Sequence, residues 1–128
     1  MPKFGKASLA KLDTCHPDLQ RIFNEVIKTY DCSILEGHRS NERQKELYHQ
    51  GKSKIKSGGK HNSLPSAAAD VAPYPIDWND KNRFCHFAGR VQGIALMLDI
   101  KIRWGGDWNG DNNLKNQTFF DLPHFELI

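Results

Sequence analysis

The stretch Lys60–Asp80 reads KHNSLPSAAADVAPYPIDWND and places one carboxylate, Asp70, inside a run of small apolar residues. This composition predicts a buried strand over Ser66–Ala72, because the prolines and the IDWND turn that follow end the run. An ionised carboxylate is costly to bury without a cation or several hydrogen-bond donors. A metal ion would supply that partner, and His61, upstream of a Pro65–Ser66 turn, could bring an imidazole beside Asp70.

A second polar group lies near the carboxyl end, where DLPHFELI places Asp121 and His124 on either side of a proline turn. In a regular strand, residues three apart point to opposite faces, so the turn decides whether these two side chains converge. Glu126 shares a strand face with His124 and is a candidate to orient that imidazole. Taken alone, such residues fit a structural hydrogen-bonding role as well as metal ligation. The residues by themselves therefore leave both interpretations open.

Helical and strand patterns alternate around these two stretches. The predicted elements are helices over 17–30, 41–50 and 81–98, and strands over 32–36, 66–72, 100–104 and 124–128. Ser40 and Asp80 are suited to cap the second and third helices. Strands separated by helices predict one α+β domain that spans residues 1–128.

Composition sets the class of protein. A chain of 128 residues with 38% hydrophobic and 26% charged residues is expected to fold around one core. Its three cysteines (Cys15, Cys32, Cys85) cannot all pair and lack CxxC spacing, so we expect free thiols. The amino terminus lacks the apolar segment of a signal peptide, and no stretch is long enough to span a bilayer, so no stable membrane insertion is expected.

The segment Gly51–Lys60 (GKSKIKSGGK) contains four lysines and three glycines and has no apolar period. This pattern predicts a mobile basic loop. The loop is either a solvated connection or an electrostatic lip beside a site that receives an acidic substrate.

Four motifs together carry a resemblance to a known family. The stretches KHNSLPSAAADVAPYPIDWND, RWGGDW and DLPHFEL, with EGHRSNERQ upstream, resemble the zinc peptidases that include D-alanyl-D-alanine carboxypeptidases and phage L-alanyl-D-glutamate endolysins. The resemblance implies the Hedgehog/DD-peptidase-like fold, a small, mainly antiparallel sheet flanked by helices. The sequence departs from the family pattern at two places. Gly59 stands where a serine is frequent, and the gap between His61 and Asp70 is longer than in the commonest members.

The resemblance also implies roles for individual residues. It makes His61, Asp70 and His124 the ligands of Zn²⁺, Asp121 the catalytic base, and Arg39 a contact to the substrate or transition state. Two imidazoles and one carboxylate leave zinc a fourth position for water, as catalytic sites require. The alternative role for Arg39 is a surface ion pair with a neighbouring glutamate, Glu36 or Glu42.

The function implied is that of a phage-type endolysin that hydrolyses the L-alanyl-D-glutamate bond of cell-wall stem peptides. We expect a monomer that is made in the host cytoplasm and reaches bacterial peptidoglycan in the periplasm after a separate protein permeabilises the membrane. The alternatives are a D-alanyl-D-alanine carboxypeptidase of the same family and a non-catalytic wall-binding module. A metal-dependent nuclease is disfavoured because no second His/Asn pair has the required ββα spacing, so no nucleic-acid partner is expected.

Overall fold

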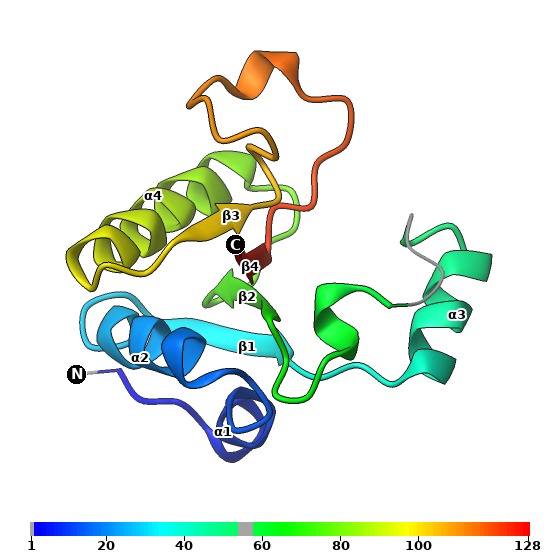
Figure 1. The fold of residues 1–128 in the computed structure, drawn as a ribbon. Coiled ribbons are helices and arrows are strands. Elements are labelled where there is room, and N and C mark those ends of the chain that lie inside the picture. The colour runs from blue at the N-terminus through cyan, green and yellow to red at the C-terminus, as the bar shows by residue number, and fades with distance from the viewer. Residues whose placement is uncertain (1, 54–57) are drawn as a thin grey trace.

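One antiparallel sheet organises residues 2–53 and 58–128, the part of the chain that the computed structural model describes (Figure 1). Its strands are β1 (Cys32–Glu36), β2 (Ala68–Pro73), β3 (Ile102–Trp104) and β4 (His124–Leu127). They lie in the order β1-β2-β4-β3. The carboxyl-terminal strand therefore lies between β2 and β3, which brings two segments far apart in sequence next to each other.

Helices cover one face of this sheet. The helices are α1 (Lys6–Leu12), α2 (Pro17–Val26), α3 (Asn41–His49) and α4 (Lys81–Met97), with 3-10 turns η1 (Lys60–Asn62) and η2 (Leu114–Asn116). α1 packs on β1, and α4 contacts α2, β2 and β3. α3 stands away from the sheet, beyond η1 (Figure 1). The predicted α+β class with a small antiparallel sheet is confirmed.

Strand alternation separates the core from the polar face. Ala69 and Phe125 belong to the hydrophobic core on the helix side. Their neighbours Asp70 and His124 project to the opposite face, because successive side chains of a strand alternate. Asp70 is paired with His124 across β2 and β4, and with Glu36 across β1 and β2. Three polar side chains thus form a row across three adjacent strands.

Several predicted boundaries were wrong. The strand predicted over Ser66–Ala72 runs instead over Ala68–Pro73. The first long helix ends at Val26 instead of residue 30, because the amides of Lys28 and Thr29 bond to carbonyls three residues back, which tightens the chain into turns. The strand predicted from residue 100 begins at Ile102. The sequence did not predict α1. Both expected helix caps were confirmed: Ser40 accepts a hydrogen bond from the amide of Arg43, and Asp80 accepts one from the amide of Arg83.

The cysteines are free thiols, as expected. Cys15 and Cys32 lie in the core, and burial raises the pKa of their thiols to about 11 and about 12. These thiols are therefore protonated at neutral pH and serve as small core residues. Among the described residues, no helix has the length and apolar character needed to span a membrane.

Candidate metal centre

Three side chains from different elements meet on the polar face of the sheet. Asp70 Oδ1 lies 3.2 Å from His61 Nε2 and 3.2 Å from His124 Nδ1, and the two nitrogens are 3.3 Å apart. Ligand atoms bound 2.0–2.1 Å from a tetrahedral zinc are separated from one another by about 3.3–3.4 Å. The three atoms therefore already have the spacing of one face of a metal coordination tetrahedron, and the group could hold a metal ion.

Hydrogen bonds on the outer side of each imidazole fix which nitrogen faces the group. His61 Nδ1 donates to the carbonyl of Gly37 at 2.8 Å, and His124 Nε2 donates to Glu126 Oε1 at 2.9 Å. The inward nitrogens are then left with lone pairs that face Asp70 Oδ1. Three acceptor atoms at this spacing need a shared cation, either a proton or a metal. The contact expected between Glu126 and His124 is present.

The turn that presents His61 is clamped to the segment after β1. The backbone amide of Arg39 donates to the carbonyl of His61 at 2.6 Å. The side chain of Asn62 donates to the carbonyl of Arg39 at 2.8 Å and accepts from the amide of Gly59 at 2.8 Å. These hydrogen bonds hold the η1 turn over the sheet, which allows His61 to reach Asp70.

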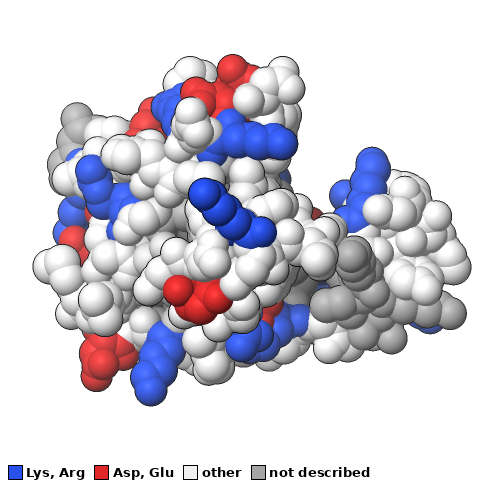
Figure 2. Space-filling view, turned by 90° about the horizontal axis from the view of Figure 1, so that it is seen from above, with Lys and Arg blue, Asp and Glu red and all other residues white. Residues whose placement is uncertain are grey.

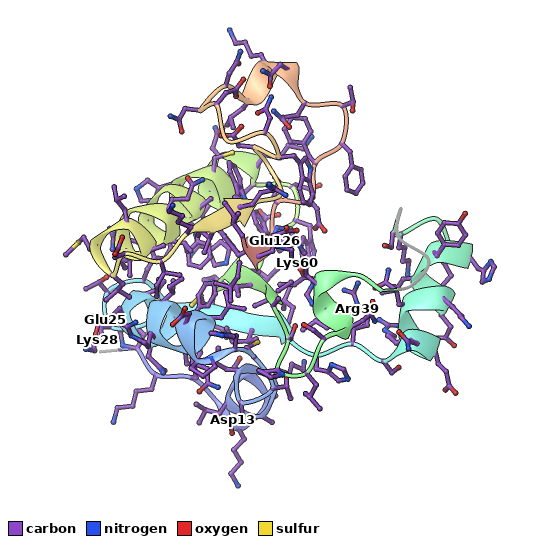
Figure 3. All side chains as sticks on the ribbon, in the orientation of Figure 1. Asp13, Glu25, Lys28, Arg39, Lys60 and Glu126 are labelled. Atoms are coloured by element: carbon purple, nitrogen blue, oxygen red, sulfur yellow. The ribbon has the colours of Figure 1, made fainter. Side chains whose placement is uncertain are left out.

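Lys60 does not belong to a mobile basic loop, contrary to the sequence prediction. It begins η1, and its ammonium group lies 3.5 Å from Glu126 Oε2 and donates to the carbonyl of Leu127 (Figure 3). Of the other lysines predicted in that loop, Lys54 and Lys56 lie outside the described residues. The carboxylate that fixes His124 is thus itself held by a cation.

Arg39 is buried and bound to protein groups through all three guanidinium nitrogens. Nε and Nη2 donate to the two oxygens of Glu36 at 3.0 and 2.8 Å, and Nη1 donates to Gln44 Oε1 at 2.8 Å. Nη2 also lies 3.4 Å from Asp70 Oδ2. The ion pair with Glu36 is therefore formed, but in a buried position (8% exposed) instead of at the surface. Asp70 presents one oxygen to the imidazoles and the other to Arg39.

Asp121 lies beside the group without joining it. Its Oδ2 is 4.0 Å from His124 Nδ1, and its side chain keeps 35% of its surface exposed. Burial, followed by the negative charge of Asp70, raises the pKa of the Asp121 carboxyl above its usual value. A partly exposed carboxylate with a raised pKa, next to a possible metal, has the properties of a proton acceptor.

Comparisons with known proteins identify the family. Residues 1–128 match the family described as phage L-alanyl-D-glutamate peptidase. This chain belongs to that family. It is 34% identical over 135 residues to the L-alanyl-D-glutamate peptidase of Escherichia phage T5, with 98% of both chains covered. As a member of this peptidase family, the chain is an enzyme.

Two further relatives agree. The peptidoglycan L-alanyl-D-glutamate endopeptidase CwlK of Bacillus subtilis (strain 168) is 30% identical over 118 residues, which cover 79% of this chain and 63% of that protein. The crystal structure of the L-Ala D-Glu endopeptidase ChiX of Serratia marcescens superposes with a TM-score of 0.79 at 29% identity, and covers 99% of this chain and 91% of that one. The fold expected from the resemblance is thereby confirmed.

In this member of the peptidase family, a glycine controls where Asp121 lies. The amide of Asp121 donates to the carbonyl of Gly105, and the amide of Gly105 donates to the carbonyl of His124. A Cβ atom added at Gly105 would overlap the carbonyl oxygen of Asp121. The backbone here has no room for a side chain.

If Asp121 is the proton acceptor, Gly105→Ala should lower hydrolytic activity by about tenfold or more, because even a 1 Å displacement of a reacting group is costly. Zinc content and kcat/KM would be measured for this variant and for Gly93→Ala, which meets nothing within 4 Å in α4. Gly93→Ala should match the natural protein. Full activity in Gly105→Ala would show that the position of Asp121 does not depend on this contact.

The electrostatics of the group predict a pH dependence for the metal-free protein. Burial opposes protonation of His124, but hydrogen bonds to Asp70 and Glu126 outweigh it and raise the pKa from 6.5 to about 9. A raised folded-state pKa contributes stability that is complete below 6.5 and is lost as the pH rises through about 9. Urea unfolding in the presence of a chelator should show this decline, and stability that rises across the same window would contradict it.

A cavity of about 1230 Å³ opens over His61, Asp70 and His124. Trp108 and Phe120 line it, and the Trp108 ring lies against His124 with ring centroids 5.4 Å apart. Trp104 belongs instead to the core and is 4% exposed. The aromatic residues near the carboxyl end therefore divide between the cavity wall and the core.

Proposed function

We propose that this chain is a zinc peptidase that hydrolyses the L-alanyl-D-glutamate bond of peptidoglycan stem peptides. The observation that carries the proposal is the triangle of His61 Nε2, Asp70 Oδ1 and His124 Nδ1, whose members lie 3.2–3.3 Å apart. Two imidazoles and one carboxylate are a ligand set typical of catalytic zinc with one open position. Membership of the peptidase family supports the choice of bond.

In the proposed reaction, the metal and the side chains have different roles. Zinc, when bound, supplies the Lewis acidity that makes water nucleophilic near neutral pH. Asp121 accepts a proton from the attacking water, whose oxygen adds to the alanyl carbonyl. Asp121 then delivers that proton to the D-glutamate nitrogen as the C–N bond breaks, so the products are a carboxylic acid and an amine. The 4.0 Å distance between Asp121 and His124 supports a place beside the metal.

Arg39 is assigned here to positioning Asp70. Its Nη2 lies 3.4 Å from Asp70 Oδ2, which leaves Oδ1 directed at the imidazoles. Glu36 in turn holds the guanidinium through two hydrogen bonds. A direct contact between Arg39 and the substrate, as the family resemblance implies, stays a prediction.

Digestion of purified sacculi by the zinc-loaded protein, followed by mass analysis, tests the proposal. New amino termini on D-glutamate are expected, together with one equivalent of zinc and loss of both zinc and activity after chelation. Release of D-alanine would instead identify a carboxypeptidase. Binding to sacculi without any product would identify a wall-binding module.

The site of action follows from the proposed substrate. An enzyme of this kind made in the host cytoplasm would reach the wall only after a separate protein permeabilises the membrane. That partner and the monomeric state stay predictions.

A further inference from the structure

The lining of the cavity over His61, Asp70 and His124 includes two chemically different groups of side chains, which we call its two ends. On the side of α3 it is lined by the cationic side chains of Arg43 and Lys52, and Figure 2 shows Lys and Arg on the lobe that α3 forms. The other side is formed by the connection between β2 and α4 and by the segment before β4. There the lining includes the aromatic rings of Trp78 and Phe120. His61, Asp70 and His124 belong to the same lining.

Trp78 is held with one face available. Its ring stacks on Phe84 at a centroid distance of 5.4 Å and an interplanar angle of 19°. Phe84 is only 2% exposed, whereas Trp78 is 59% exposed. A stacked partner covers one face of an indole, so the exposed surface of Trp78 includes the other face. Phe120, in the same cavity lining, is 50% exposed.

The chemistry of the proposed substrate matches these two ends. In peptidoglycan, the amino group of the first L-alanine is acylated by the lactyl group of N-acetylmuramic acid. A sugar ring therefore stands one residue away from the L-alanyl-D-glutamate bond, on its acyl side. On the other side, D-glutamate continues the chain through its γ-carboxyl group and keeps a free α-carboxylate. The substrate thus has a carbohydrate end and an anionic end.

We infer that Trp78 and Phe120 form a subsite for the N-acetylmuramic acid ring, with the C–H face of the sugar packed on the indole of Trp78. The anionic part of the stem peptide then lies toward Arg43 and Lys52, where opposite charges attract. This orientation rests on the proposed function, since it places the scissile bond at the metal centre. It gives the exposed aromatic rings a role that folding does not require of them.

The test compares two substrates that differ only in the sugars. The first is the peptide L-alanyl-γ-D-glutamyl-diaminopimelate with the disaccharide of peptidoglycan attached to its alanine through the lactyl group of N-acetylmuramic acid. The second is the same peptide with only a lactoyl group on its alanine and no sugar. Glycan preference is the ratio of the two kcat/KM values. Trp78→Ala should lower this preference about fivefold, the size of one aromatic stacking contact, whereas Trp78→Phe should keep most of it.

Tyr74→Ala provides the matched control, because Tyr74 lies in the same connection, is 53% exposed and is not among the residues that line the cavity. Its glycan preference should equal that of the natural protein. Equal losses on both substrates in Trp78→Ala, or an unchanged preference, would overturn the sugar subsite. If the natural protein cleaves neither substrate, the proposed function itself fails, and that result is distinct from the loss of preference alone.

Discussion

Asp121→Asn should lower kcat by about two to four orders of magnitude while the protein folds normally and binds zinc nearly as well as before. Asparagine keeps the shape of aspartate but cannot accept the proton of the attacking water. Asp121 lies outside the group of three atoms that could hold the metal, at 4.0 Å from His124 Nδ1. Zinc stoichiometry and peptide hydrolysis, measured on the same preparation, check both halves of the expectation.

Two outcomes would contradict the assignment of Asp121. A variant that had lost its zinc would make Asp121 a ligand and would overturn the division of roles. A variant that kept both zinc and full activity would show that Asp121 is not the base. Glu126 would then be the next carboxylate to test, because it contacts His124 on the same face of the sheet.

His124→Ala should abolish tight zinc binding and turnover together. The imidazole would contribute one of three protein bonds to the metal, and its removal also leaves Glu126 without the hydrogen bond it now accepts at 2.9 Å. The loss differs from that in Asp121→Asn because metal content falls with activity. Equilibrium dialysis against zinc and the hydrolysis assay measure the two quantities.

His86→Ala is the matched control for this change. His86 lies on α4 and contacts Tyr30 through its ring nitrogen at 3.0 Å, away from the metal group. Its removal should leave both zinc binding and turnover close to those of the natural protein. Retention of one equivalent of tightly bound zinc in His124→Ala would remove His124 from the ligand set.

Local features of the chain were predictable because their physical causes are local. Ser40 and Asp80 cap helices through their own side chains, which bond to amides three residues later. The alanine run around Asp70 indicated a buried strand, and β2 is buried, with Ala69 fully so. The partners that the Asp70 carboxylate was expected to need are present as His61, His124 and Arg39. The boundary at Val26 was missed because the apolar period continues past the point where the backbone tightens into turns.

The meeting of His124 with Asp70 depends on strand order, which the sequence alone does not reveal. His124 and Asp70 face each other because β4 pairs with β2, and 54 residues separate them in the chain. The family resemblance named these residues as ligands, but their spacing and outer hydrogen bonds appear only in the folded chain. Local pattern could not anticipate them, because each contact joins segments that only the sheet brings together.

Arg39 illustrates the same division. The sequence placed Glu36 three residues from Arg39, and an ion pair with Glu36 or Glu42 was the alternative role predicted for Arg39; the pair with Glu36 is the one formed. Only the tertiary structure decided that the pair is buried and that the guanidinium also lies beside Asp70 Oδ2. The sequence by itself thus determined which charged groups exist and which helices and strands carry them. The pairing of strands that are far apart in the sequence decided which of those groups meet in one buried site, because burial and strand register depend on the whole sheet at once.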